Sequence, residues 1–282
     1  MTKVTTTDRP APAPAGPAAE SPSTRLRAAM GLLLPALSGA GTRLWYRQNL
    51  AEVYPRYLVA MHQVIRASVP LMEDAVRALR AVGDRGAAGD RGAAGRGAGD
   101  RLIVDYLERH IPEERDHDDW VLEDLERLGH TVDGVLRVHP YPAVATLAGA
   151  QYYYIRHHDP AAIIGYIAQL EGYPPDEALL AAAAERTGLP FAAFRTMRKH
   201  AHLDPFHRRD LDLLVDALPP DPHRSALITG SALEAGAALV TLIEQVCARP
   251  PIGMPAPAPA NAPANAPANV PADARADADA RG

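Results

Sequence analysis

Three potential metal ligands lie close together in the stretch KHAHLDPFH. His200, Asp204 and His207 are separated by four and then three residues, a spacing that stacks side chains on one face of a helix. Imidazole and carboxylate groups on an inward face are costly to bury unless something binds them, and a metal ion would do so. A polar helix end with scattered histidines is the alternative for this motif alone. The face continues in both directions with apolar residues, namely Ala193, Met197, Leu211 and Leu214.

A second pair of candidate ligands, Glu114 and His117, stands in the stretch PEERDHDDW. A Glu-x-x-His pair on an inward helical face is the half-site of helical di-iron proteins. Taken alone the pair is weak, because surface helices carry many Glu and His side chains. The apolar residues expected on the same face are Leu107, Ile111, Val121, Leu125 and Leu128. The other acidic residues of this stretch are expected on the solvated face: Glu113, Asp116, Asp118 and Asp119.

Glu171 is the third element of the candidate site. It follows Ile164 and Ile167 at helical spacing, so it is expected to point with their apolar face. It also stands at the predicted C-terminus of that helix, where the helix dipole disfavours an anion, so a positive group is expected nearby. An exposed terminal Glu is the alternative. Oxygen and imidazole donors of this kind suit Fe or Mn, and no thiolate competes among them.

Composition excludes several classes of protein. The net charge of −5 argues against a general nucleic-acid binder. The single Cys247 excludes an internal disulfide and fits a reducing cytosol, so we expect a cytoplasmic protein. We find no run that approaches the ~20 apolar residues of a membrane span, so no membrane partner is expected. Residues 28–40 are interpreted as a loop or a short helix that packs on the core.

The chain is expected to form one domain, residues 25–250, between two disordered tails. Residues 1–24 are rich in Pro and Ala, and residues 251–282 are rich in Pro, Ala and Asn, so neither can bury enough apolar surface to offset its ordering entropy. Residues 83–100 repeat GDRGAAG and are predicted to be a low-complexity loop insertion.

Apolar residues recur at helical spacing in most of the remaining chain, and no stretch alternates long enough to be a strand. Pro112 is expected to divide the third helical run, and Pro70 to separate the first two. The sequence therefore predicts an all-α fold. The expected helices are residues 44–67, 71–79, 101–128, 141–156, 160–171, 176–186, 190–218 and 225–246.

These motifs together resemble the haem-oxygenase-like di-iron oxidases and oxygenases, the iron-containing redox enzyme family. The resemblance covers residues 54–246 and depends on Glu114-x-x-His117, on GAQYYYIRHHDPAAIIGYIAQLEG, and on HAHLDPFH. It implies a haem-oxygenase-like helical bundle that binds two Fe(II) ions per chain, with Mn as an alternative. The ligands that it implies are Glu114, His117, Glu171, His200, Asp204 and His207.

The resemblance also implies an O2-activating non-haem di-iron oxidoreductase. Its substrate would be a small amine or amino-acid-derived metabolite of specialised biosynthesis, with N-oxygenation favoured over oxidative C–C or C–H cleavage such as decarboxylation or desaturation. The implied partners are this substrate and O2, with a ferredoxin or reductase as electron donor and a homodimer as a candidate assembly. A metal-free enzyme of the same fold and a non-catalytic iron-binding or interaction protein are the alternatives.

Three further groups are candidates for the site or its surroundings. His62 would be the axial ligand of a haem, but a haem leaves the six other ligands unexplained, so we expect His62 and Arg66 in the core or at a pocket rim. One tyrosine of residues 152–154 could line a substrate pocket. Arg156, His157 and His158 could meet a substrate carboxylate or answer the helix dipole.

Overall fold

Helices make up the described chain, residues 20–86 and 91–257 of this computed structural model, and no strand occurs in these ranges. The predicted all-α class is confirmed. The elements in chain order are α1 Pro22–Gly31, α2 Leu34–Trp45, α3 Leu50–Gly86, α4 Arg91–Glu114, α5 His117–Arg127, α6 Val132–Leu136, α7 Pro142–His157, η1 Pro160–Ala162, α8 Ile163–Leu170, α9 Glu177–Thr187, η2 Phe191–Phe194, α10 Arg195–Ala217 and α11 Pro222–Ala248.

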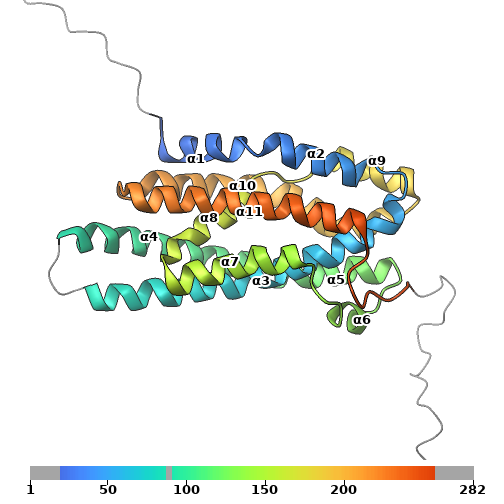
Figure 1. Cartoon of the computed structure of the whole chain (residues 1–282), viewed down its shortest axis with the longest axis horizontal. Helices are drawn as coiled ribbons and strands as arrows, with labels where there is room; N and C mark the ends of the chain where they lie inside the picture. Colours follow the sequence, from blue (N-terminus) through green and yellow to red (C-terminus); the bar gives the residue numbers. More distant parts are fainter. Residues whose placement is uncertain (1–19, 87–90, 258–282) are drawn as a thin grey trace, which may run out of the picture.

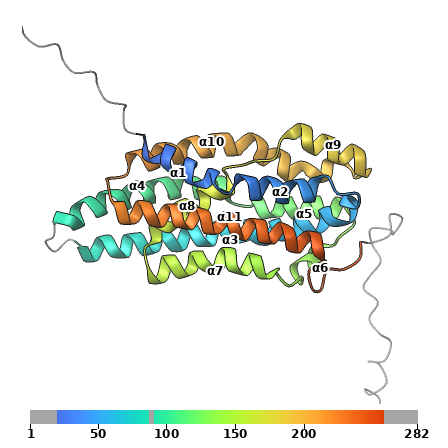
Figure 2. The same cartoon turned by 45° about the horizontal axis from the view of Figure 1, so that its top comes forward.

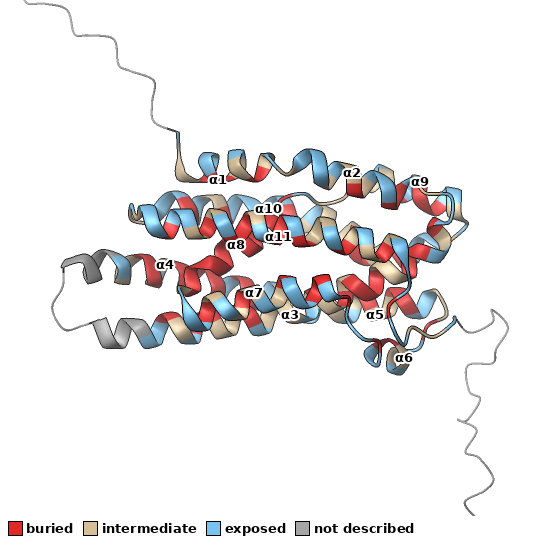
Figure 3. Cartoon of the chain, in the orientation of Figure 1, coloured by how far each residue is buried: buried red, intermediate tan, exposed pale blue. Residues whose placement is uncertain are grey.

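The longer helices run nearly parallel to the long axis of a bundle (Figures 1 and 2). Helix α11 packs along α8 and α7 and contacts α2, while α3 packs against α4, α5 and α7. The short helix α8 crosses obliquely between α11 and α7 (Figure 1). Buried residues line the inward faces of the long helices and nearly the whole of α8 (Figure 3).

Helix α8 owes its central place to its composition. All residues from Ile163 to Gln169 are buried, as expected for a helix that is apolar around its whole circumference. Gly165 allows its backbone to approach α11, because a Cβ at this position would lie 2.0 Å from the carbonyl oxygen of Ile228. Glu171, the C-cap residue of α8, therefore lies in the middle of the bundle.

Several predicted boundaries differ from the observed ones. The first two predicted helices form one helix, α3, with Pro70 inside it, and Pro112 lies inside α4 rather than at a helix start. Each proline removes only one backbone hydrogen bond. Packing of the apolar residues on both sides of each proline, such as Val64 and Leu71 around Pro70, keeps the helices continuous.

The N-terminal part of the fold begins earlier than predicted. Residues 22–24, assigned to the tail, form the first turn of α1, and residues 28–40 contribute to both α1 and α2. Ser21 caps α1 with its side chain, and Pro22 occupies the first helical position. The hydroxyl of Ser23 donates a 2.9 Å hydrogen bond to Asp216, which ties α1 to α10.

The segment 83–100 is helical at both ends where a loop was predicted, since α3 continues to Gly86 and α4 begins at Arg91. Asp100 forms a 2.8 Å ion pair with Arg224, and Gly99 packs closely against Pro219. These contacts hold the start of α4 against the connection between α10 and α11. Residues 87–90, and most of both predicted tails, lie outside the described residues.

Helix α11 corrects the expectation that no run is long and apolar enough to span a membrane. An 18-residue window of this helix has a mean hydropathy of 1.7, which passes by length and composition alone. In the bundle, Ile228, Ala232 and Leu242 of α11 are buried in the core. Because the core helix of a soluble domain passes the same test, this single helix is weak support for a membrane span.

Candidate metal centre

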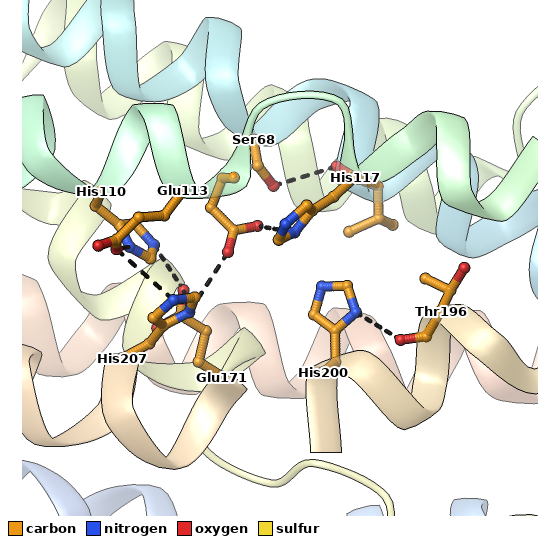
Figure 4. Close-up of polar contacts among 10 residues, drawn as sticks. Ser68, His110, Glu113, His117, Glu171, Thr196, His200 and His207 are labelled. Carbon is orange, nitrogen blue, oxygen red and sulfur yellow. Dashed lines mark hydrogen bonds and ion pairs between the residues drawn. The ribbon is translucent and has the colours of Figure 1, made fainter. Parts of the chain in front are cut away.

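Helix α10 presents its three candidate ligands on the predicted inward face. Asp204 and His207 are buried, and so are the apolar neighbours Met197 and Leu211 on the same face. The Nδ1 of His200 donates a 3.0 Å hydrogen bond to the carbonyl oxygen of Thr196 (Figure 4). A hydrogen bond from one ring nitrogen fixes the tautomer and the orientation of a metal-binding imidazole. In His200 it leaves Nε2 free to bind a metal ion.

The sequence suggested that Glu114 and His117 lie on one helical face, but they belong to two different helices. Glu114 ends α4, His117 begins α5, and Asp116 between them adopts a left-handed conformation with φ of 66°. Such a conformation is costly for a residue other than glycine and often marks a functional site. The two side chains nevertheless meet, with Nδ1 of His117 3.2 Å from Oε2 of Glu114.

Glu171 lies beside a histidine, His110, which is the positive group expected near a carboxylate at a helix C-terminus. The Nε2 of His110 donates a 2.8 Å hydrogen bond to Oε1 of Glu171. Burial lowers the pKa of His110, but this hydrogen bond and the charges of Glu171 and Glu114 outweigh it and raise the pKa to about 9. His110 was not among the predicted ligands.

The candidate ligands form two adjoining groups, whose ligand atoms lie within 4.8 Å of one another in each group. One group contains His110, Glu114, Glu171 and His207, and the other contains Glu114, His117 and His200. Glu114 belongs to both. Its Oε1 lies 3.4 Å from Nδ1 of His207, whereas its Oε2 faces His117. A carboxylate placed in this way can bridge two metal ions.

The charges of the centre are arranged around Glu114. Burial raises the pKa of this carboxyl, but the hydrogen bond to His117 and the charges of three histidines outweigh burial and lower it to about 2. Asp204 has the opposite environment, since burial and the charges of Glu171 and Glu114 raise its pKa to about 8. Asp204 lies beside the two groups rather than within them, and it lines the adjoining cavity with Glu114 and His200.

The sequence carries a signal for His110 that the ligand prediction did not use. His110-x-x-x-Glu114-x-x-His117 repeats the spacing of His200-x-x-x-Asp204-x-x-His207. In the fold the two motifs pair in opposite directions. The ring of His110 lies 4.7 Å from that of His207, and the ring of His117 lies 5.1 Å from that of His200.

Glu113, which was expected on the solvated face, lies at the edge of this arrangement. Its carboxylate is half exposed, yet Oε2 lies 3.4 Å from Nδ1 of His110 and 3.7 Å from Nε2 of His207 (Figure 4).

The donor set fits metal ions. Four buried donor atoms, one each in His117, Glu171, Asp204 and His207, make no hydrogen bond of normal geometry among the described residues. Buried polar atoms are nearly always paired, so unpaired donors that converge from three helices favour a bound cation. Carboxylate and imidazole donors in this mixture suit iron.

A cavity of about 400 Å³ opens beside the ligands, between α2, α3, α8 and α11. Neither His62 nor any tyrosine of residues 152–154 lines it. His62 is buried with its Nε2 4.0 Å from Asp118, and Tyr154 donates a hydrogen bond to Glu234 on the outside of the bundle. Arg156 forms an ion pair with Asp74, away from the cavity.

Comparisons with known proteins give a family match and a shared fold. Residues 110–238 match the model of a family described as iron-containing redox enzymes, which confirms the resemblance seen in the sequence. None of the curated proteins matches the chain.

Two solved structures share the fold. A domain of unknown function with a haem oxygenase-like fold from Shewanella denitrificans OS217 is similar with a TM-score of 0.60 at 16% identity, over 79% of this chain and 89% of that one. A TenA homologue from Pseudomonas syringae pv. tomato DC3000 is similar with a TM-score of 0.56 at 14% identity, over 82% of this chain and 97% of that one. The haem-oxygenase-like fold is therefore confirmed.

Proposed function

Residues 110–238 carry the pattern of the iron-containing redox enzymes, and on this basis we propose that the protein is an O2-activating non-haem di-iron oxidase or oxygenase. The observation that carries the proposal is the position of Glu114, whose two oxygens face two different groups of histidines. We propose as ligands the six predicted residues, Glu114, His117, Glu171, His200, Asp204 and His207, together with His110.

Two ferrous ions bound there would supply electrons for the reduction of O2 and would activate it toward a substrate. The chain's own residues supply orientation and charge. Thr196 orients His200 through its carbonyl oxygen, and His110 holds the carboxylate of Glu171. The low pKa of Glu114 keeps this carboxylate ionised at neutral pH, so it is ready to accept a cation.

We propose that the substrate binds in the cavity beside the ligands. Its wall is mainly apolar, with Trp45, Met61 and Ile65 among the lining residues, and such a wall excludes water from the reacting atoms. We propose a small-molecule substrate, with an amine or amino-acid-derived metabolite and N-oxygenation as the favoured case over C–C or C–H cleavage. A ferredoxin or reductase as electron donor, a homodimeric assembly, a cytoplasmic location and a role in biosynthesis complete the proposal.

Iron-dependent O2 consumption tests this function, with Glu171→Ala as the variant and Glu126→Ala as its control. Glu126 is exposed on α5. It belongs to neither ligand group, and it does not line the cavity. We expect the control to bind iron and consume O2 as the wild type does, and Glu171→Ala to lose both. Unchanged iron content and O2 consumption in Glu171→Ala would refute the proposed centre, and O2 consumption that needs no metal would favour a metal-free enzyme.

A further inference from the structure

The cavity contains a polar group that the metal centre does not use. Gln169 of α8 lines the cavity and is 2% exposed, and both its Oε1 and its Nε2 are buried without a hydrogen-bond partner. Leaving both ends of a buried carboxamide unpaired costs free energy that a bound molecule could recover. Gln169 is therefore an unsatisfied donor and acceptor in the wall of the proposed substrate cavity.

The carboxamide of Gln169 is held against α11. A Cβ on Gly236 would lie 3.1 Å from its Cδ and 3.2 Å from its Oε1, so the absence of a side chain at Gly236 makes room for the amide. Tyr166 stands three residues earlier, on the same face of α8, and also lines the cavity. Its hydroxyl is buried and has no hydrogen-bond partner of normal geometry among the described residues. The two side chains form one uncharged polar strip.

The charges around the cavity restrict what can bind to this strip. Among the described residues that line the cavity, none is Lys or Arg, and the carboxylates are those of the metal centre, Glu114, Glu171 and Asp204. The remaining wall is mostly apolar, with residues such as Leu37, Val64, Leu239 and Ile243. An anionic group of the ligand would find no fixed cation away from the metals, and a cationic one would find no free carboxylate there. A ligand group that meets Gln169 is therefore uncharged.

We propose that Gln169 determines substrate specificity by exchanging hydrogen bonds with an uncharged, carboxamide-type group of a substrate that is apolar apart from this group and the group that reacts at the metal centre. A carboxamide offers both a donor and an acceptor, which complements the Oε1 and Nε2 of Gln169. A site built to hydrogen-bond such a group rejects analogues that lack it, because its own buried polar atoms then stay unpaired. The ligand is the substrate only if the proposed function holds, whereas its binding to Gln169 does not require O2 chemistry.

Three probes of one shape test the proposal by calorimetry on the iron-loaded protein under anaerobic conditions. Octanamide offers a donor and an acceptor, nonan-2-one keeps only the acceptor, and 2-methylnon-1-ene has neither. We expect the wild type to bind octanamide at least about tenfold more tightly than the ketone, and the alkene to bind more weakly than either.

The variant Gln169→Met keeps a side chain of similar length without its hydrogen-bonding groups. We expect it to lose the preference for octanamide by about tenfold or more, and to bind the alkene at least as well as the wild type does. Gln48→Leu is the control, because Gln48 is exposed and does not line the cavity. Iron content and thermal unfolding check that each variant is folded and loaded.

Equal affinities of the wild type for the three probes would overturn the proposal, and so would failure of octanamide to bind up to its solubility limit. These results do not depend on whether Gln169→Met folds. An unchanged preference in a folded Gln169→Met would overturn it equally. If instead the preference is present in the protein without iron, and the protein neither binds two irons nor consumes O2, the role of Gln169 in binding stands and the proposed oxidase function fails.

Discussion

Glu114 and His110 stand one helical turn apart on α4, and together they connect the two ligand groups. Glu114 contacts His117 with one oxygen and His207 with the other, so it is the residue on which a paired metal centre most depends. His110 holds Glu171 and lies within ligand distance of the same group.

The variant His110→Ala tests whether this imidazole serves the metal centre. Removing this imidazole takes away one candidate ligand and frees the Glu171 carboxylate, so we expect one of the two irons to bind at least about 10–100-fold more weakly while the other is retained. Anaerobic Fe(II) titration measures this effect. His130→Ala is a suitable control, because His130 is also buried but lies in neither ligand group. Two tightly bound irons in His110→Ala would show that His110 serves only the packing of the bundle.

Five of the six residues in the two groups, and Asp204 beside them, were predicted as ligands from the sequence, whereas their arrangement around Glu114 was not. His110 lies outside the Glu-x-x-His pair, and only the repeat of the spacing of four and three found on α10 indicates it in the sequence. The left-handed Asp116 could not be predicted, since nothing in its side chain requires that conformation.

At the scale of elements, the position of Glu171 depends on how closely α8 approaches α11. Gly165 makes this approach possible, since a Cβ there would also lie 2.8 Å from the backbone nitrogen of Ala232. Both atoms that it would meet belong to backbone, which cannot move aside as a flexible side chain can. The two helices would have to separate.

Gly165→Ala is therefore expected to destabilise the protein by about 1–3 kcal/mol, the usual cost of overpacking a core, and to weaken iron binding through Glu171. The matched control is Gly230→Ala in α11, where an added Cβ meets nothing within 4 Å. The control is expected to stabilise the helix by about 0.5–1 kcal/mol. Chemical denaturation compares the two, and equal stability of both variants would contradict the close packing described here.

The periodicity of apolar residues predicted most helices but not where they join or break. Pro70 and Pro112 lie inside helices and not at their ends, because packing on both sides of each residue is a tertiary effect that a local pattern does not contain. The break between α4 and α5, at Arg115 and Asp116, in contrast contains no glycine or proline from which it could be predicted.

At the scale of the whole molecule, Arg224 joins three distant parts of the chain. It forms ion pairs of 2.8 Å with Asp100 on α4 and 3.0 Å with Asp159, the residue that caps η1. Its side chain is only 8% exposed, so these charges are largely removed from water. Asp100 lies in the segment predicted to be a loop, and this contact helps to explain why that end of the segment is helical.

We expect Arg224→Leu to lower the free energy of unfolding by about 3–5 kcal/mol, because it leaves two buried carboxylates without their cation. The control is Arg43→Leu, which removes the exposed pair with Glu244 and should cost at most about 1 kcal/mol. Urea denaturation distinguishes the two variants. A loss as small as that of the control would mean that the buried pairs do not hold the bundle together.

The number of ferrous ions bound per chain tests the central claim most directly. Anaerobic Fe(II) titration of the full chain, followed by equilibrium dialysis and iron analysis, should give two irons per chain, both lost when Glu114 is replaced by Ala. Binding of a single iron, or of none, would contradict a centre in which Glu114 connects two metal sites.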